Sequence, residues 1–270
     1  RLTIAGRFTH VRQADYGTDY RASKITPRLG LSVSVDSHTS VYALRDQSFL
    51  PQSGLLRGDR APKPLTGNNL EVGIKRDWFG DCWTTTLSLY RILENGKLTT
   101  DPDTTGNANN RYSLQVGQNK TQGVEFDVRG EIIKGLNVVV NYAYTDSKIS
   151  KDVNKTLVGT PVPGFAKHDA NAWLTYTIQA GTLKGLGFSA GATYMKDRST
   201  WDWGTTSHDR LPDYLNTDAG IHWQHHKVKV NLTVGNVLNK YLYSGAPYGN
   251  YYYWQTEAPR NFKLGFDYRF

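Results

Sequence analysis

The sequence lacks the marks of several common classes of protein. Only Cys82 among the 270 residues is a cysteine, so no disulfide can form within the chain. No stretch approaches the roughly 20 consecutive apolar residues that a membrane-spanning helix requires. One methionine, 26 glycines and 12% aromatic residues make the chain rich in strand formers and poor in residues that fill helices. The composition therefore predicts an all-β protein.

Low hydropathy does not exclude a membrane location for such a protein. The mean hydropathy is −0.55. A strand of a membrane barrel, however, needs only about 9–11 residues, of which every second one faces lipid. The mean hydropathy of a chain therefore cannot exclude a membrane β-barrel.

Dense basic segments, which are typical of nucleic-acid-binding proteins, are also missing. The net charge is +8, but the Lys and Arg residues are scattered along the chain. We therefore expect no nucleic-acid partner.

Residue patterns for catalysis are weak. His168 and Asp169 form a neighbouring acid and imidazole pair, but no serine lies in a nucleophile-elbow context. Because no complete acid-base set is visible, a hydrolase is the least favoured hypothesis, and we expect no enzyme.

Two patterns suggest metal binding only faintly. His222, His225 and His226 surround a predicted short turn, without a cysteine or carboxylate at ligand spacing. The run 101–106 resembles a calcium loop without its terminal bidentate Glu, so turn chemistry explains it better. The sequence therefore predicts no metal site and no resident cofactor.

Period-two alternation of apolar and polar residues gives the clearest positive signal. It is strongest in 136–145, 227–235 and 261–270, each with one apolar and one polar or charged face. Similar alternation predicts twelve strands, near 1–11, 24–35, 38–47, 68–77, 82–93, 111–130, 135–147, 168–179, 186–197, 213–223, 227–238 and 260–270.

The connections between these strands alternate between short and long. The long loops are expected near 12–23, 48–67, 94–110, 148–167, 198–212 and 239–259. This arrangement is typical of a transmembrane barrel, which has short periplasmic turns and longer extracellular loops. If Phe270 ends at the periplasmic side, all the long loops are extracellular. A soluble sandwich or propeller is the alternative, although its strands are usually shorter.

The polar faces would line the inside of such a barrel. Charged residues expected there are Glu71, Lys75, Asp77, Glu125, Asp127, Arg129, Asp218, Lys263, Asp267 and Arg269. Their favoured role is structural, because such charges pair with neighbouring strands and with whatever fills the barrel.

Several segments resemble, in order, those of TonB-dependent siderophore receptors. They include Ile25-Thr-Pro-Arg-Leu-Gly, Leu70-Glu-Val-Gly-Ile-Lys, Gly123-Val-Glu-Phe-Asp and Asn141-Tyr-Ala-Tyr-Thr-Asp. Val234-Gly-Asn-Val-Leu-Asn-Lys-Tyr and Ala258-Pro-Arg, which leads into Tyr268-Arg-Phe, continue the series. Each motif is weak alone, but six in register are a strong signal.

The resemblance implies that residues 1–270 are the C-terminal portion of a barrel of about 22 strands with a plugged lumen. It implies an outer-membrane protein that binds a ferric siderophore and imports it with energy relayed by TonB. The other expected partners are outer-membrane lipid and lipopolysaccharide. The plug, the TonB-contacting segment and the first strands would precede Arg1. With two unpaired edges, the fragment is expected not to fold alone. A complete, passive twelve-stranded channel is the alternative.

Aromatic residues in two expected external loops are the candidate ligand contacts. Exposed rings there have no folding reason to cluster, and they can bury the organic shell of a chelate. The alternative is that they belong to the upper aromatic girdle. The candidates are Trp201, Trp203, Tyr248, Tyr251, Tyr252, Tyr253 and Trp254.

Overall fold

The computed structural model describes residues 1–270 except 16–17, 107–110, 163, 200–209 and 249–250. The described part forms one antiparallel sheet of thirteen strands and a separate two-stranded sheet. The main sheet contains β1 (Leu2–Asp15), β2 (Thr18–Ser34), β3 (Thr39–Leu50), β4 (Leu65–Trp78), β5 (Trp83–Thr100), β6 (Ser113–Ile133), β7 (Leu136–Lys151), β8 (Ala166–Thr177), β9 (Leu186–Ser199), β10 (Arg210–Leu211), β11 (Tyr214–His225), β12 (Val228–Gly235) and β15 (Asn261–Tyr268). The second sheet pairs β13 (Tyr243–Tyr248) with β14 (Tyr251–Thr256), and a 3-10 helix, η2, covers Lys155–Leu157.

In the described ranges, no helix has the length and apolar character needed to cross a membrane.

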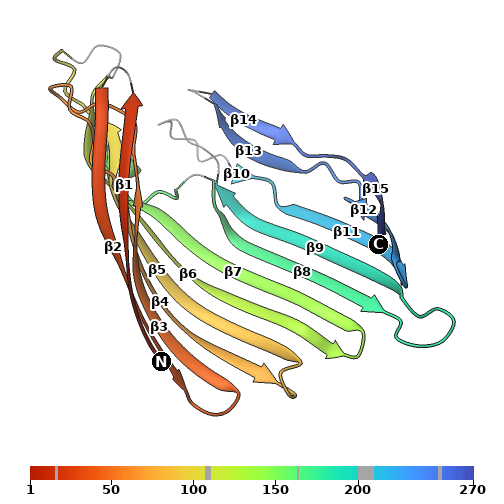
Figure 1. The fold of residues 1–270 in the computed structure, drawn as a ribbon. Coiled ribbons are helices and arrows are strands. Elements are labelled where there is room, and N and C mark those ends of the chain that lie inside the picture. The colour runs from red at the N-terminus through yellow and green to blue at the C-terminus, as the bar shows by residue number, and fades with distance from the viewer. Residues whose placement is uncertain (16–17, 107–110, 163, 200–209, 249–250) are drawn as a thin grey trace.

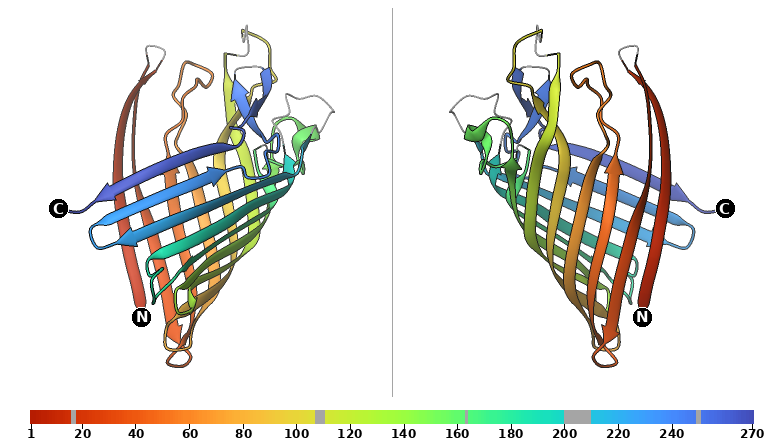
Figure 2. Two further views of the ribbon diagram at one scale, coloured as in Figure 1. Left: turned by 90° about the vertical axis from the view of Figure 1, so that its right-hand side faces the viewer. Right: turned by 90° about the vertical axis from the view of Figure 1, so that its left-hand side faces the viewer.

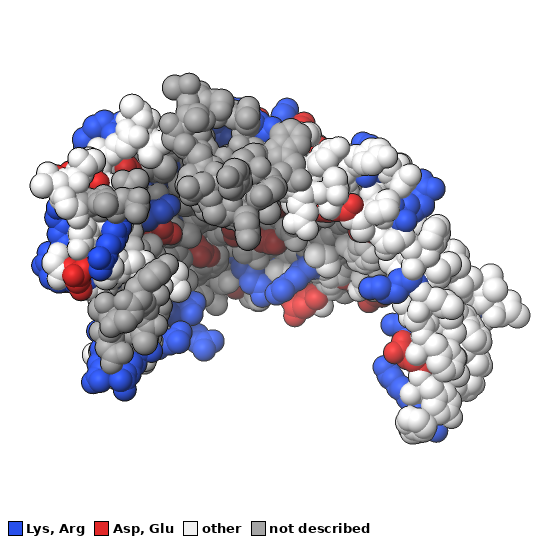
Figure 3. Space-filling model, turned by 90° about the horizontal axis from the view of Figure 1, so that it is seen from above, with Lys and Arg blue, Asp and Glu red and all other residues white. Residues whose placement is uncertain are grey.

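The main sheet is strongly curved. From β1 to β9 each strand pairs with the next, β9 then pairs with β11, β11 with β12 and β12 with β15, while β10 pairs with β9 off this path (Figure 1). The two edges of the sheet are β1 and β15. Figure 3 shows the result from above as an arch with a hollow side. Within the described part of the chain β1 and β15 do not pair, so the arch is part of a barrel wall and is not closed.

The two ends of the strands differ. At one end the strands are joined by short connections, such as 35–38, 79–82 and 226–227, and Figure 1 shows both termini toward this end. We call it the short-turn end. The other, the long-loop end, carries 51–64, the segment after β5 and the β13–β14 hairpin. The predicted alternation of short and long connections is thus present from β2 onward.

Alternation along each strand separates an apolar convex face from a polar concave face. Across β3 and β4, Val41 lies opposite Ile74, and the next pair, Tyr42 and Gly73, belongs to the other face. The convex apolar side chains are exposed, with 51% of Leu89 and 75% of Leu264 accessible. A face of this kind is stable when lipid covers it. In Figure 3 acidic and basic side chains are visible on the hollow side of the arch, and others lie along its rim.

The twelve predicted long strands are all present, in the predicted order, but two predicted loops are wrong. Residues 12–23 are not a long loop, because β1 and β2 stay paired as far as Asp15 opposite Thr18. The 239–259 segment contains the β13–β14 hairpin, with Tyr243 opposite Thr256. In both places the backbone ladder continues where apolar alternation has stopped.

Candidate functional site

The concave face brings the predicted charged residues onto one surface. The register places Glu71 opposite Tyr90, and Lys75 opposite Thr86, which in turn pairs with Asp127. When this register is followed from strand to strand, nine of the predicted charged residues lie on the concave face of the sheet, and Arg269 follows the end of β15. The nine are Glu71, Lys75, Asp77, Glu125, Asp127, Arg129, Asp218, Lys263 and Asp267. Lys75 Nζ lies 3.8 Å from Asp77 Oδ1. This surface is therefore polar and charged, as the alternation predicts.

Aromatic rings lie flat across glycines on this face. A Cβ added to Gly73 would stand 2.5 Å from Cζ of Tyr42, so the Tyr42 ring occupies that space. The Tyr42 hydroxyl then donates to Glu71 Oε1 over 2.7 Å. Trp173 covers Gly191 in the same way, with its Cε3 2.0 Å from an added Cβ. The two glycines thus leave room for large rings to lie close against the sheet.

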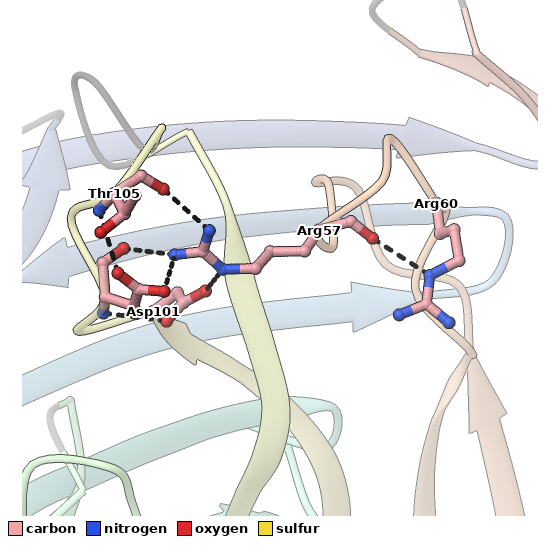
Figure 4. Close-up of polar contacts among 5 residues, drawn as sticks. Arg57, Arg60, Asp101 and Thr105 are labelled. Carbon is pink, nitrogen blue, oxygen red and sulfur yellow. Dashed lines mark hydrogen bonds and ion pairs between the residues drawn. The ribbon is translucent and has the colours of Figure 1, made fainter.

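Two long-loop segments are clamped together at the long-loop end by Arg57 (Figure 4). Arg57 Nε lies 2.5 Å from Asp101 Oδ2, and Arg57 Nη2 lies 3.0 Å from Asp103 Oδ2. Its guanidinium also donates to the carbonyl oxygens of Asp103 (2.5 Å) and Thr105 (2.9 Å). The Asp101 side chain is only 4% exposed, so this ion pair is largely desolvated.

The run that resembles a calcium loop is therefore occupied by an arginine side chain. Asp101 Oδ1 accepts the Asp103 N–H over 3.0 Å, and Asp103 Oδ1 accepts the Thr105 N–H over 2.9 Å. The hydrogen bonds from the Thr105 backbone and side chain, with Arg57 nearby, hold the pKa of Asp103 below its usual value. The turn-chemistry interpretation of 101–106 agrees with these contacts. Sequence reasoning missed Arg57, because no local pattern links residues 44 positions apart.

A second contact joins the same two segments. Asp59 Oδ1 lies 3.0 Å from Arg111 Nη2 and accepts a hydrogen bond from the Tyr112 hydroxyl over 3.1 Å. The Ser113 N–H donates to the Leu55 carbonyl over 2.9 Å. The 51–64 segment is thereby fastened to Arg111, Tyr112 and the first residue of β6.

The predicted aromatic contacts lie at the long-loop end only in part. Trp201 and Trp203 lie outside the described residues. The backbone of Tyr248 faces that of Tyr251 in the β13–β14 hairpin, and Pro247, Ala246 and Gly245 face Tyr252, Tyr253 and Trp254. The side chains of these aromatic residues are outside the described part, so their role stays a prediction.

The base of this hairpin is held firmly to the main sheet. The Tyr214 hydroxyl donates to Glu257 Oε2 over 2.7 Å. Asn236, which is buried and has a φ of 50°, donates through Nδ2 to the carbonyls of Lys240 (2.9 Å) and Ala258 (3.3 Å). Its N–H donates to Asp218 Oδ1 over 2.9 Å. The segment 234–241, which resembles the siderophore receptors in sequence, is thus a hydrogen-bonded bend that positions the hairpin.

The histidines near the β11–β12 turn make ring contacts. The His225 ring stacks on Trp223 at 5.5 Å and meets the His226 ring edge-on at 4.2 Å. His222 Nε2 lies 3.2 Å from the Thr177 hydroxyl. Within the described ranges no group of three or more His, Cys, Asp or Glu residues is arranged to hold a metal ion.

Comparison with known proteins gives one family and a set of similar receptors. The family described as TonB dependent receptor-like, beta-barrel, matches residues 1–239. The metal-pseudopaline receptor CntO of Pseudomonas aeruginosa (strain UCBPP-PA14) is 25% identical over 263 residues, which are 96% of this chain and 36% of CntO. The ferrioxamine B receptor of Salmonella typhimurium (strain SL1344) is 24% identical over 277 residues, covering 95% of this chain and 37% of that receptor.

A solved structure shows the same fold. The pyoverdine outer membrane receptor FpvA from Pseudomonas aeruginosa PAO1, bound to pyoverdine, superposes with a TM-score of 0.81 and 23% identity. The match covers 100% of this chain and 39% of FpvA. The chain therefore spans little more than a third of the length of the proteins it matches.

Proposed function

We propose, because this chain belongs to the TonB dependent receptor-like β-barrel family, that it forms the C-terminal part of the wall of a ferric-siderophore importer. The family is one of outer-membrane receptors and transporters and not of enzymes. One observation carries the proposal. The barrel family model matches residues 1–239 of a curved sheet whose polar concave face would be the inside of such a wall. The names of CntO and of the ferrioxamine B receptor support a metal chelate as the ligand.

The free edges of the sheet support the view that the working protein is longer. In lipid, each unpaired backbone group costs several kcal/mol, so β1 and β15 both require partners. The strands that the relatives carry in addition would supply them, together with a plug and a TonB-contacting segment. The expectation that residues 1–270 do not fold alone remains a prediction. A complete passive channel is not favoured, because β1 and β15 do not pair in the described structure and the relatives are receptors.

The short-turn end is proposed to face the periplasm and the long-loop end the outside. The short connections at one end and the clamped loops at the other support this orientation. It places the C-terminus at the periplasmic side and the β13–β14 hairpin toward incoming ligand. The convex apolar face would contact outer-membrane lipid and lipopolysaccharide.

A binding experiment tests the proposal. A full-length receptor that carries this chain would be purified in detergent and titrated with ferric pyoverdine, ferrioxamine B and ferrichrome. We expect one class of iron chelate to bind far more tightly than its iron-free form. Equal, weak binding of all chelates would contradict the proposed function.

A further inference from the structure

A hollow in the wall lies outside the surfaces described above. It has a volume of about 930 Å³ and is lined by 20–24, Phe49, 61–64, Thr66, 95–96 and Gln115. It exists because β2 pairs with β3 only from Arg28 to Ser34, so that residues 18–27 have β1 alone as a neighbour. Figure 2 shows the β1–β2 hairpin standing apart from β3 toward the long-loop end. We call this space the wall hollow.

The chemistry of the lining favours an anion. Arg21, Lys24 and Lys63 line the wall hollow, and no aspartate or glutamate is among the described residues of its lining. Within the described residues, no carboxylate lies at ion-pair distance from these three side chains. Cations around one space raise the local concentration of anions and bind phosphate oxygens through charge-assisted hydrogen bonds.

The floor of the wall hollow is preformed. Gln52 Nε2 donates to the carbonyls of Lys63 (3.0 Å) and Gly96 (2.8 Å). Gln115 Oε1 accepts the Lys63 N–H over 2.9 Å, and Gln115 Nε2 donates to the Lys63 and Gly96 carbonyls. Pro62 beside them is fully buried. The backbone of Lys63 is therefore held in place before any ligand arrives, and its side chain extends from a fixed point.

A buried hydroxyl without a partner is a second, independent sign of a ligand. Tyr20 is 8% exposed and lines the wall hollow, and its hydroxyl has no hydrogen-bond partner within the described structure. Leaving a buried donor unsatisfied costs about 1–3 kcal/mol. An anionic oxygen in the hollow would satisfy it.

We propose that the wall hollow is a binding site for a phosphate-bearing group, held by Arg21, Lys24 and Lys63 with the Tyr20 hydroxyl as an added donor. The group is either the phosphorylated headgroup of outer-leaflet lipid or a dissolved phosphate compound. The site is separate from the aromatic hairpin that we assign to the chelate. Its volume lies within the roughly 300–1,000 Å³ that is usual for ligand sites.

The test uses a full-length receptor in detergent with two probes. Sodium pyrophosphate is titrated calorimetrically, and retention of lipid A added to the micelles is measured by native mass spectrometry. The variant R21Q/K24Q/K63Q should weaken binding roughly tenfold or more. The control K134Q/K184Q/K227Q removes three charges from the short-turn end and should bind as the unmodified receptor does. Tyr20→Phe should weaken binding severalfold without lowering the thermal stability of the anion-free receptor.

The outcomes separate the two sources of phosphate. Pyrophosphate binding alone, lost in the triple variant, identifies a dissolved ligand, whereas lipid A retention lost in that variant identifies the headgroup. The proposal is overturned if the unmodified receptor binds neither probe, or if the triple variant and its control bind equally. Chelate binding is measured in the same preparations. A receptor that binds a chelate but neither probe refutes the wall hollow alone.

Discussion

Arg57 shows how a single side chain can set the shape of the long-loop end. Its guanidinium holds Asp101, Asp103 and Thr105 of another segment in place (Figure 4). We expect Arg57→Ala to release the 101–106 segment, because the nearly buried Asp101 carboxylate would lose its cation. Loss of roughly 1–3 kcal/mol of local stability would speed protease cleavage in 51–64 or 101–106 about tenfold or more. Arg60→Ala is the control, since within the described residues the Arg60 guanidinium donates to no group but the Arg57 carbonyl. Equal cleavage rates in the two variants would refute the clamp.

The same clamp should respond to acid in a defined direction. Hydrogen bonds from Thr105 lower the pKa of Asp103 below the ordinary value of 3.8. A carboxyl with a lowered folded-state pKa stabilises the clamp above its unfolded pKa, and that stabilisation is lost as the pH falls through the folded pKa. The segment 101–106 should thus keep its hydrogen-exchange protection at neutral and mildly acidic pH and lose it below about pH 4. Asp103→Asn should weaken this pH dependence, and unchanged dependence would contradict the assignment.

Residue-level prediction from the sequence is therefore uneven. Asp101-Pro-Asp103 can be recognised as turn chemistry from local preferences alone. That Arg57 pairs with these two aspartates cannot be foreseen, because only the three-dimensional arrangement of the loops brings Arg57 to them. The wall hollow cannot be predicted from the sequence for the same reason. Arg21, Lys24 and Lys63 line one space only because β2 and β3 diverge there.

At the scale of elements, alternation predicts the strands that have one apolar and one polar face. It fails at the tip of the β1–β2 hairpin and at β13–β14, where the ladder continues without an apolar stripe. Backbone hydrogen bonds can continue a ladder without an apolar stripe, so a paired segment need not show the alternation of a half-buried strand. The 239–259 segment, with its run of aromatic residues, therefore reads as a loop, although its backbone is paired.

The close contact between strands predicts a sensitive glycine. A Cβ at Gly123 would lie 2.2 Å from the Tyr144 carbonyl oxygen and 2.6 Å from the Tyr90 hydroxyl. We expect Gly123→Ala to destabilise the barrel by about 1–3 kcal/mol through overpacking, measured as the urea midpoint of a full-length receptor. Gly6→Ala is the control, because its added Cβ would meet only an Ile25 carbon at 3.9 Å. A midpoint unchanged by Gly123→Ala would show that β6 and β7 are less closely packed.

The hairpin and the 198–212 segment carry the ligand prediction. Replacing Trp201, Trp203 and Trp254 together by Ala should weaken ferric-siderophore binding roughly tenfold or more, because buried aromatic contacts dominate such sites. Trp223→Ala, at the short-turn end, should leave the affinity unchanged. Both variants are compared by titration of a full-length receptor with the bound chelate. Unchanged affinity in the triple variant would remove these aromatic residues from the site.

At the scale of the whole molecule, the polar concave face and the two free edges have one common explanation. A curved antiparallel wall with an exposed apolar outer face is complete only when further strands close it and lipid surrounds it. The barrel type was predictable from strand and loop counts together with the ordered family-like segments. The identity of the chelate was not, because it depends on loop side chains and on segments that the relatives carry beyond this length.

The most direct test of this account is uptake of radiolabelled ferric siderophore by cells whose only siderophore receptor is a full-length protein carrying this chain. Uptake is measured in paired strains with and without TonB. The account predicts uptake that saturates with chelate concentration and disappears without TonB. Uptake that is equal in both strains and rises linearly with concentration would indicate a passive channel and contradict the account.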